Sequence, residues 1–323
     1  MLNHDPTRLL SSRVWVTATL CLIAQVPDIC RAQDASTYYT VQHPEQFKID
    51  WGAFYRQAEK KTTEVRAALP HHLDIPYGPA IKQRLDLYLP TGKPQHAPVF
   101  LFLHGGGFRE GDRLQYGFVA KPFAAHGIIT AVASYRLTGD GAKYPDQPED
   151  ARLALAWLYH HAAEYGGDPD RLYLGGHSAG AIIAADLGVD RTWMKEAGIP
   201  TRALRGIAPV SGTYDMRTKD APGETNVYAP TRELQDRASP ILHVKSPVPA
   251  AVVAVGSEEK AEEFVVSSRQ LADKMTAAGA HVKFLSLAGE DHRATVAALG
   301  EEQSELFRAV LAMIEGDHRS ALR

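Results

Sequence analysis

Short apolar runs alternate with longer segments of mixed character along most of the chain. The apolar runs fall at residues 99–103, 127–135, 206–210, 250–255 and 281–287. Runs of this kind are typical of strands buried on both faces of a sheet. Segments with a helical pattern lie between or after them, at residues 150–164, 264–278 and 302–314. This alternation predicts an α/β fold with a mostly parallel central sheet and helices on both faces.

The flanking segments add weaker signals. Residues 49–69 have a helical composition that Pro70 ends, which predicts an amino-terminal helix. Residues 84–89 alternate leucines with polar side chains, which predicts an antiparallel strand with one solvated face. We expect Glu149 or Asp150 to cap the helix at 150–164. The proline-containing passage at 211–249 predicts loop with at most short helices.

A strand, a sharp turn and a helix are expected at residues 171–189. The apolar run at 172–174 leads into Gly176-His177-Ser178-Ala179-Gly180, and an Ala/Ile/Leu-rich segment follows. These five residues fit Gly-x-Ser-x-Gly, in which glycines avoid collisions with the neighbouring strand and helix. The turn would present the Ser178 hydroxyl at a helix amino terminus, which favours developing negative charge. An ordinary strand-to-helix turn can also produce this pentapeptide.

A second glycine cluster, His104-Gly105-Gly106-Gly107-Phe108, directly follows the apolar run at 99–103. Three glycines after a strand leave backbone N–H groups free to point at one spot. In acyl transfer that spot holds the developing oxyanion, and one fixed donor there contributes about 2.7–4 kcal/mol. A merely flexible loop would explain the glycines but not their position, one strand-helix unit before the serine turn.

Together these motifs resemble the α/β-hydrolase fold, in the esterase branch related to hormone-sensitive lipase and to kynurenine formamidase. The first likeness rests on HGGG at 104–107, YRL at 135–137, YGGDPDR at 165–171 and GHSAG at 176–180. The formamidase likeness rests on QRLDLYLP at 83–90, PVSGTYD at 209–215, EF at 263–264 and SSR at 267–269. The resemblance covers residues 73–315 and implies a serine carboxylesterase.

The resemblance also implies the partners of Ser178, because the family order is serine, acid, histidine. His292 is the candidate base, since it lies in a loop just after the last predicted strand. The acid should follow the strand that ends at Val255, where these esterases usually have Gly-x-x-Asp. Here the chain has Gly256-Ser257-Glu258-Glu259, which favours Glu259. Glu258 is the close alternative, and Glu262 a remote one.

A mechanism follows from these positions. Ser178 attacks a carbonyl carbon while His292 takes the hydroxyl proton, and the N–H groups of Gly106, Gly107 and Ala179 hold the oxyanion. His177 is interpreted as a packing or hydrogen-bonding residue. Residues expected to supply pocket walls are Phe108, Tyr135 and Tyr214.

The predicted substrates are esters of short or aromatic acyl groups, because the sequence shows no obvious large helical lid. Formyl-amide hydrolysis, as in an arylformamidase, is the alternative within the same chemistry. A catalytically inactive binding protein of the same fold is the alternative from another class.

The first residues read as a secretory leader. Arg8 and Arg13 precede the apolar residues 14–26, and Ala32 is a candidate cleavage residue. An uncleaved membrane anchor is the alternative. Three parts are therefore predicted: a signal peptide at 1–32, a partly helical extension at 33–72 and a catalytic domain at 73–323. The extension either packs on the sheet or lies over the active-site mouth.

Composition excludes several classes of function. Both cysteines lie in the leader, so the mature chain needs no disulfide, thiol nucleophile or cysteine-bound metal. A net charge of −3 without a basic cluster argues against nucleic acid. Adjacent histidines at 71–72 and 160–161 have no third ligand spaced with them, so no metal and no cofactor are predicted. We expect an exported enzyme with a small-molecule ester as its partner and no stable membrane association after leader cleavage. The oligomeric state stays open.

Overall fold

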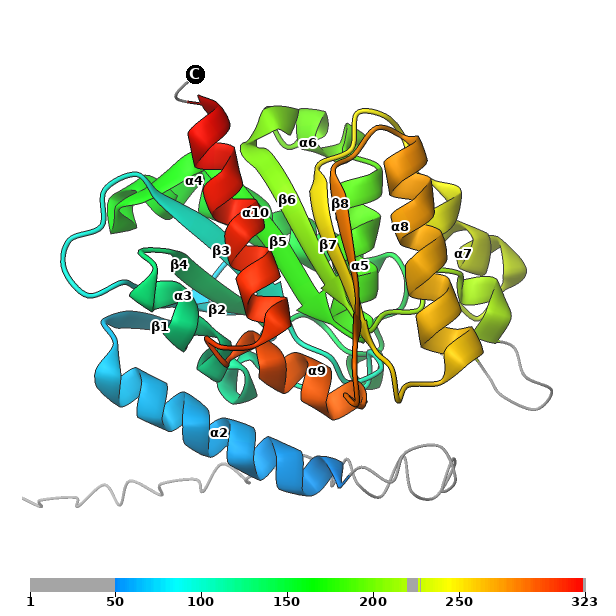
Figure 1. Cartoon of the computed structure of the whole chain (residues 1–323), viewed down its shortest axis with the longest axis horizontal. Coiled ribbons are helices and arrows are strands. Elements are labelled where there is room, and N and C mark those ends of the chain that lie inside the picture. The colour runs from blue at the N-terminus through cyan, green and yellow to red at the C-terminus, as the bar shows by residue number, and fades with distance from the viewer. Residues whose placement is uncertain (1–49, 220–225, 227, 322–323) are drawn as a thin grey trace, which may run out of the picture. The chain divides into compact units, whose positions relative to one another are not determined.

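An eight-stranded sheet forms the centre of the computed structural model, which describes residues 50–219, 226 and 228–321, and of residues 218–219 and 317–321 the backbone alone (Figure 1). The strand order is β1-β2-β4-β3-β5-β6-β7-β8. The strands are β1 (His71–Pro76), β2 (Arg84–Tyr88), β3 (Ala97–Leu103), β4 (Ile129–Ala133), β5 (Gly167–His177), β6 (Leu204–Val210), β7 (Ala250–Gly256) and β8 (Val282–Leu287). β1 and β2 pair antiparallel, and β3 to β8 are parallel. The predicted mostly parallel sheet is confirmed.

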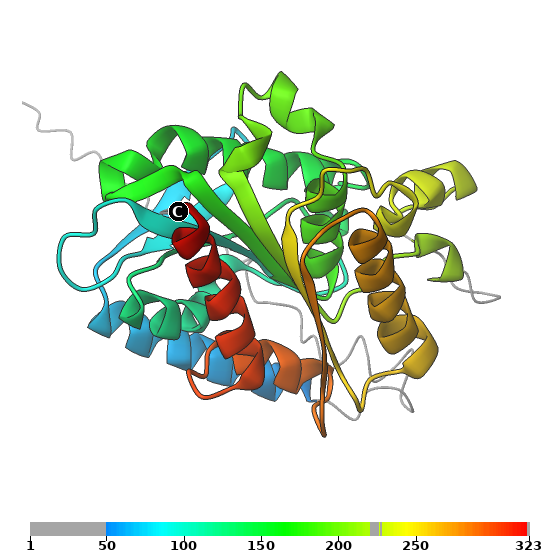
Figure 2. The same ribbon diagram turned by 45° about the horizontal axis from the view of Figure 1, so that its top comes forward.

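Helices cover both faces of the sheet, as predicted (Figure 2). One face packs against α4 (Asp146–His161), α5 (Ala179–Val189), α6 (Thr192–Glu196) and α8 (Ser267–Ala277), with α7 (Arg232–Arg237) beside them. The other face packs against α2 (Trp51–Ala68), α3 (Ala120–Ala125), α9 (His292–Leu299) and α10 (Glu305–Ala321).

The side chains of β3 contribute to the hydrophobic core on both faces of the sheet. Val99 and Leu101 lie in the core under α4 and α5, whereas Phe100 and Phe102 lie in the core under α2 and α10. Successive side chains of a strand point to opposite faces, so a run without polar residues is what a sheet covered on both sides requires.

The prediction that β2 has a solvated face is wrong. The Asp86 side chain has no exposed surface, because it accepts hydrogen bonds from Arg66 Nη2 and Arg113 Nε, each at 2.9 Å. Its Oδ1 also accepts the main-chain N–H of Asp74 at 2.8 Å. Arg66 belongs to α2, so the charge in β2 anchors the amino-terminal helix over the sheet instead of facing water.

The predicted cap of α4 is also wrong. The helix begins at Asp146, and Asp150 lies inside it. The Asp150 carboxylate accepts from Gln83 Nε2 at 2.6 Å and from Arg136 Nη2 at 2.7 Å. It therefore ties α4 to the segments before β2 and after β4.

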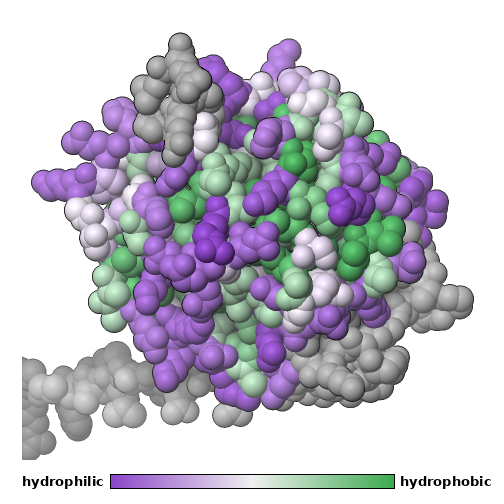
Figure 3. Space-filling view, in the orientation of Figure 1, coloured by the Kyte–Doolittle hydropathy of each residue, from purple (hydrophilic) through white to green (hydrophobic). Residues whose placement is uncertain are grey.

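The amino-terminal helix is present as α2, and the described residues of the passage 211–249 hold only short helices, as predicted. The predicted leader lies outside the described residues. Among the helices described, none combines the length and apolar character needed to cross a membrane. Polar residues cover most of the face seen in Figure 3, with hydrophobic ones scattered among them.

Candidate active site

Ser178 lies at the sharp turn between β5 and α5. Its backbone has φ 54° and ψ −117°, which residues with side chains adopt only where the surrounding structure forces it. A Cβ on Gly176 would collide with the carbonyl oxygen of Gly180, so the turn needs glycine there. The predicted Gly-x-Ser-x-Gly turn is present, and Ser178 is partly exposed at the carboxyl end of β5.

The sequence predicted His292 in a loop, but in the structure it is the first residue of α9. Asp291 caps this helix: its carboxylate accepts the main-chain N–H groups of Arg293 at 3.0 Å and Ala294 at 2.7 Å. The cap fixes the direction in which the helix leaves β8. The histidine is 5% exposed and is therefore held in place by its surroundings.

The structure brings Glu259 to His292. Glu259 Oε2 lies 2.6 Å from His292 Nδ1, and the side chains are 1% and 6% exposed. Glu259 Oε1 accepts the Gly256 N–H at 2.8 Å and the Ser211 hydroxyl at 2.6 Å. Glu258 is exposed and contacts Ser257, so it is not brought to the histidine. Glu262, the remote alternative, is also exposed.

His177 links the serine turn to the histidine. Its Nε2 lies 2.8 Å from the main-chain oxygen of His292, and the two imidazole rings are 4.6 Å apart. A carbonyl oxygen can only accept, so Nε2 carries the proton in this bond. Burial lowers the pKa of His177 well below its usual value, and the neighbouring His292 adds to that effect. His177 is therefore a neutral hydrogen-bonding residue, in line with the interpretation of the sequence.

The glycine loop lies directly against the serine turn. A Cβ on Gly105 would be 3.2 Å from Ser178 Cβ. Gly106 and Gly107 have φ values of 119° and 59°, in the region that favours glycine, and Phe108 also has a positive φ, of 63°. Ala179 is the first residue of α5, so its N–H has no carbonyl partner within the helix. The three predicted oxyanion donors therefore belong to two segments that meet beside Ser178.

His104 supports this loop from beneath. It is completely buried and stacks on Tyr135 at 4.3 Å between ring centroids. Its Nδ1 lies 2.7 Å from the carbonyl oxygen of Gly105, and burial lowers its pKa to about 4. A neutral histidine with the proton on Nδ1 therefore holds the start of the glycine loop.

The three residues predicted to form the pocket walls are all buried. Tyr214 and Tyr135 are completely buried, so neither presents a surface to a substrate in this structure. Phe108 is 3% exposed and stacks on Tyr228 at 3.6 Å between ring centroids. Tyr214 lies on a loop, as predicted, but the loop is buried there, and the Tyr214 hydroxyl accepts the Gly212 N–H inside the core.

Two aromatic residues beside the histidine were not predicted. The rings of Trp51 and Phe264 lie 5.9 Å and 4.7 Å from the His292 ring. Trp51 is the first residue of α2, so this end of the amino-terminal extension borders the site. The described part of the extension packs on the sheet, as the first alternative predicted, and that it covers the mouth of the site stays a prediction. The apolar residues of the segment 49–69 indicated a helix that packs on something, but the sequence did not show that Trp51 contacts His292, which lies far along the chain.

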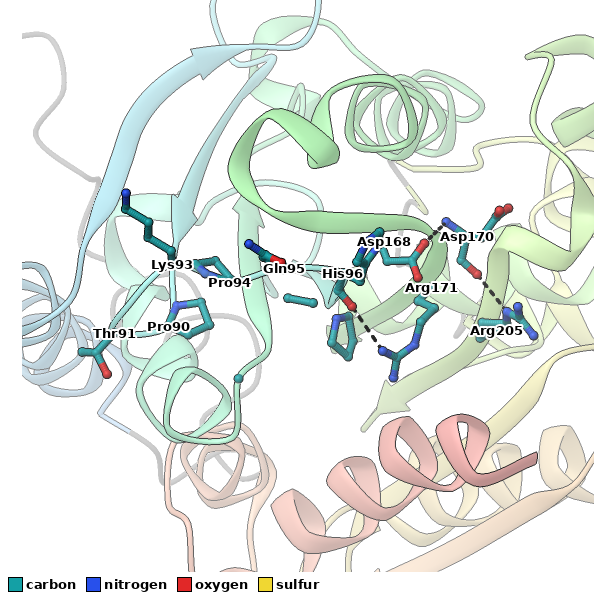
Figure 4. A pocket seen from close by; sticks show the side chains of 13 residues that line it. Pro90, Thr91, Lys93, Pro94, Gln95, His96, Asp168, Asp170, Arg171 and Arg205 are labelled. Carbon is teal, nitrogen blue, oxygen red and sulfur yellow. Dashed lines mark hydrogen bonds between the residues drawn. The ribbon is translucent and has the colours of Figure 1, made fainter. Parts of the chain in front are cut away.

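A hollow of about 630 Å³ lies at the amino ends of the strands, where β3, β5 and β6 begin (Figure 4). Its polar groups largely bind one another: Arg171 donates to the His96 carbonyl, and Arg205 donates to that of Asp170. No residue of the candidate catalytic set lines it. The candidate residues Ser178, Glu259 and His292 instead follow β5, β7 and β8, at the carboxyl ends of the strands, where open α/β sheets bind their ligands.

Comparison with known proteins places the chain among such hydrolases. Residues 85–275 match the BD-FAE family, which is more than half of the 323 residues. The chain belongs to the BD-FAE family. The matched region contains Ser178 and Glu259 and ends before His292, while α2 precedes it.

Individual relatives of this BD-FAE family member are enzymes. It is 28% identical over 260 residues to the kynurenine formamidase of Danio rerio, covering 78% of this chain and 85% of that protein. It is 26% identical over 270 residues to an isoprenylcysteine alpha-carbonyl methylesterase of Arabidopsis thaliana, covering 77% of this chain and 63% of that protein. The chain thus spans less than two thirds of the plant enzyme.

A solved structure shares the fold. The carboxylesterase EstE1, cloned from a metagenomic library, superposes with a TM-score of 0.62 at 22% identity, covering 84% of this chain and 97% of that chain. At this identity the likeness concerns the fold alone, and it confirms the predicted α/β-hydrolase architecture.

Proposed function

We propose that this BD-FAE family member is a serine hydrolase that cleaves carboxylic esters of short or aromatic acyl groups through an acyl-enzyme intermediate. The observation that carries the proposal is the 2.6 Å contact of Glu259 Oε2 with His292 Nδ1, next to the Ser178 turn. A carboxylate that accepts the Nδ1 proton fixes the tautomer in which Nε2 carries no proton, and Nε2 is then the nitrogen that takes a proton from a hydroxyl. The similarity to the isoprenylcysteine alpha-carbonyl methylesterase of Arabidopsis thaliana supports the same reaction class.

In the proposed acylation step, Ser178 Oγ attacks the carbonyl carbon of the ester while His292 Nε2 takes the hydroxyl proton. The carbonyl oxygen becomes an oxyanion, and the N–H groups of Gly106, Gly107 and Ala179 stabilise it. His292 then donates the proton to the alcohol oxygen, the bond from carbon to that oxygen breaks, and the acyl group stays on Ser178.

In the proposed second step, a water molecule repeats the attack on the acyl enzyme. His292 takes a proton from the water, the same N–H groups stabilise the second oxyanion, and the acid leaves as Ser178 regains its proton. Glu259 stabilises the imidazolium in both steps. The reaction as written needs no metal and no cofactor.

The surroundings of His292 support small or aromatic substrates. Trp51 and Phe264 flank its ring. Flat aromatic walls give an apolar acyl or alcohol group a large contact area at a low cost in conformational entropy.

A second candidate function is formyl-amide hydrolysis. The similarity to the kynurenine formamidase of Danio rerio, over most of both chains, favours it. The same nucleophile and base would serve, because the leaving amine needs the proton that His292 holds. The third possibility, an inactive binding protein, is opposed by the contact between Glu259 and His292.

The deciding experiment measures hydrolysis of p-nitrophenyl acetate, butyrate and octanoate and of N-formylkynurenine by the wild type and Ser178→Ala. We expect ester turnover that falls with chain length, and a loss of at least about a thousandfold in Ser178→Ala. A strong preference for N-formylkynurenine would favour the formamidase. Turnover retained in Ser178→Ala would contradict the serine mechanism.

Labelling with a fluorophosphonate separates an enzyme from an inactive binding protein. We expect one covalent adduct on Ser178 in the wild type and none in Ser178→Ala. Absence of both labelling and turnover in the wild type would favour the binding protein.

We also propose export of the protein after cleavage at Ala32. Sequencing of the amino terminus of the protein recovered outside the cytoplasm should start at Gln33. A retained leader would favour the membrane anchor instead.

A further inference from the structure

Two buried hydroxyl groups lie behind the acid and the base, and the mechanism above gives them no role. Ser211 directly follows β6, Thr295 lies in α9, and neither is exposed. Ser211 Oγ is 2.6 Å from Glu259 Oε1 and 2.9 Å from Thr295 Oγ1. Thr295 Oγ1 is in turn 3.0 Å from the main-chain oxygen of His292. The chain of contacts therefore runs from the acid to the residue that carries the base.

The directions of these hydrogen bonds follow from the chemistry of the groups. An ionised carboxylate only accepts, so the single Ser211 hydroxyl proton goes to Glu259. Thr295 is then the donor in its contact with Ser211, and its one proton is shared with the His292 carbonyl. That carbonyl also accepts from His177 Nε2 at 2.8 Å. Each hydroxyl thus serves a reacting residue and not solvent.

Glutamate needs this support more than aspartate would, because its side chain has one more rotatable bond. The Ser211 hydroxyl and the Gly256 N–H both hold Oε1 of Glu259, which leaves Oε2 directed at His292. A charge-assisted hydrogen bond at 2.6 Å is among the stronger contacts of a buried carboxylate. The pair of donors therefore selects one rotamer of the acid.

The backbone at Ser211 is consistent with a functional position. Its φ is 57°, which is unusual for a residue with a side chain. The strained conformation is held by a hydrogen bond from its N–H to the carbonyl of Ala254 in β7, at 2.8 Å. Backbone strain of this kind gathers at functional sites, where it directs a particular side chain.

We propose that Ser211 is a positioning residue, which acts through Glu259 and, with Thr295, fixes the acid and the base relative to each other. This inference rests on the proposed serine mechanism. Ser211 does not touch the substrate. Its contribution is to keep Glu259 Oε2 on His292 Nδ1 throughout the two proton transfers, when a small displacement of the imidazole lowers the rate.

A double-mutant cycle between Ser211→Ala and Glu259→Gln tests this, with p-nitrophenyl acetate as the substrate. We expect Ser211→Ala to lower kcat about 10- to 100-fold and to leave KM within about twofold. In the Glu259→Gln background the same substitution should change kcat by less than about threefold, because the carboxylate on which it acts is gone. An equal loss in both backgrounds would overturn the proposal.

The matched control is Ser239→Ala. Ser239 is also completely buried, and its hydroxyl donates to the Gln235 carbonyl at 2.6 Å and accepts the Met216 N–H at 2.9 Å, away from the acid and the base. We expect it to lower the melting temperature as much as Ser211→Ala does, with kcat unchanged. A similar kcat in both variants would reduce Ser211 to a structural serine and overturn the proposal.

Thr295→Val gives a second readout should Ser211→Ala fail to fold. It removes one hydroxyl at nearly constant volume, and we expect a smaller fall in kcat, about three- to tenfold, again absent in the Glu259→Gln background. An unchanged kcat in Thr295→Val would overturn the role of the hydroxyl pair. Failure of the serine mechanism itself is recognised separately, as activity retained in Ser178→Ala.

Discussion

Glu258 and Glu259 are neighbours in the chain, but their carboxylates lie in opposite surroundings. Glu258 is exposed beside Ser257, whereas Glu259 is buried against His292. Successive side chains that leave a strand point in opposite directions, so the end of β7 separates the two. A buried carboxylate needs donors, and Glu259 has them in Gly256, Ser211 and His292.

Amide substitution at the two positions should give very different enzymes. We expect Glu259→Gln to lower kcat by about 10² to 10⁴, because a neutral amide favours the wrong histidine tautomer and does not stabilise the imidazolium. Glu258→Gln should retain activity within about twofold. Steady-state kinetics on p-nitrophenyl acetate checks both, and equal losses would contradict the assignment of the acid.

Gly105 is a residue at which one added methyl group should matter. A Cβ there would lie 2.8 Å from His177 Nδ1 and 3.2 Å from Ser178 Cβ, and either neighbour would have to move. We expect Gly105→Ala to lower kcat/KM at least about tenfold, because displacement of the loop disturbs the oxyanion donors. Gly139→Ala is the control, since its Cβ would meet nothing within 4 Å. Unchanged rates of fluorophosphonate labelling in both variants would contradict this prediction.

At the scale of elements, α2 is held at both ends. Trp51 contacts the His292 ring at its start, and Arg66 pairs with the buried Asp86 of β2 near its end. The helix is therefore a rigid connection from the antiparallel edge of the sheet to the candidate base.

Truncations at the two ends of α2 should separate stability from activity. Trp51 and Val65 are both 4% exposed. We expect Trp51→Ala to lower the free energy of unfolding by about 3–5 kcal/mol and kcat several-fold. Val65→Ala should be destabilising to a smaller extent and leave kcat unchanged well below the melting temperature. Urea unfolding and kinetics at 20 °C, or thereabouts, check both, and equal kcat values would contradict a link from Trp51 to the base.

Elements with a local signal could be predicted, and those that depend on distant partners could not. β3 and β7 are apolar throughout, and the Gly-x-Ser-x-Gly turn identifies itself within five residues. β1, with the sequence HHLDIP, has no apolar pattern and owes its form to pairing with β2. The burial of Asp86 depends on arginines 20 or more positions away.

The residues of the candidate site likewise fall into those with a local sequence signal and those whose contacts are distant in the chain. Ser178, Glu259 and His292 could be placed by motif and order, because each follows a recognisable strand. Ser211 could not be given its role, since its contacts join residues 48 and 84 positions away. Tyr214 was assigned to a pocket wall because a loop residue was assumed to be accessible, and the structure buries it.

At the scale of the whole molecule, stability should depend on pH through a buried carboxyl group. Asp186 lies in α5 and is 8% exposed, and burial raises its pKa to about 6, against the effect of Arg152 and His243. The folded state therefore binds more protons than the unfolded state between about pH 4 and pH 6. The contribution of Asp186 to the free energy of unfolding is therefore largest below about pH 4, and it is lost as the pH rises through this range.

Replacing Asp186 should remove this loss. We expect the difference in the free energy of unfolding, Asp186→Asn minus wild type, to rise by about 2–3 kcal/mol as the pH is raised from 4 to 7.5. Asp190→Asn should change in the opposite direction, because hydrogen bonds from Lys245 and Thr192 outweigh burial and lower the pKa of Asp190. Urea unfolding at the two pH values checks the signs, and parallel pH curves for all three proteins would contradict the prediction.

The placement of α2 and α10 decides how the protein should be attached to anything else. Asp50 caps α2 one residue before Trp51, whose ring flanks His292, so a partner fused just upstream is joined at the rim of the site. α10 starts beside α9 and runs along the sheet toward the amino ends of the strands (Figure 1), and on the way its Ile314 carbonyl accepts from the Tyr173 hydroxyl of β5. Affinity tags and immobilisation supports therefore belong at the carboxyl terminus, beyond the end of α10 that lies away from α9 and His292 (Figure 1).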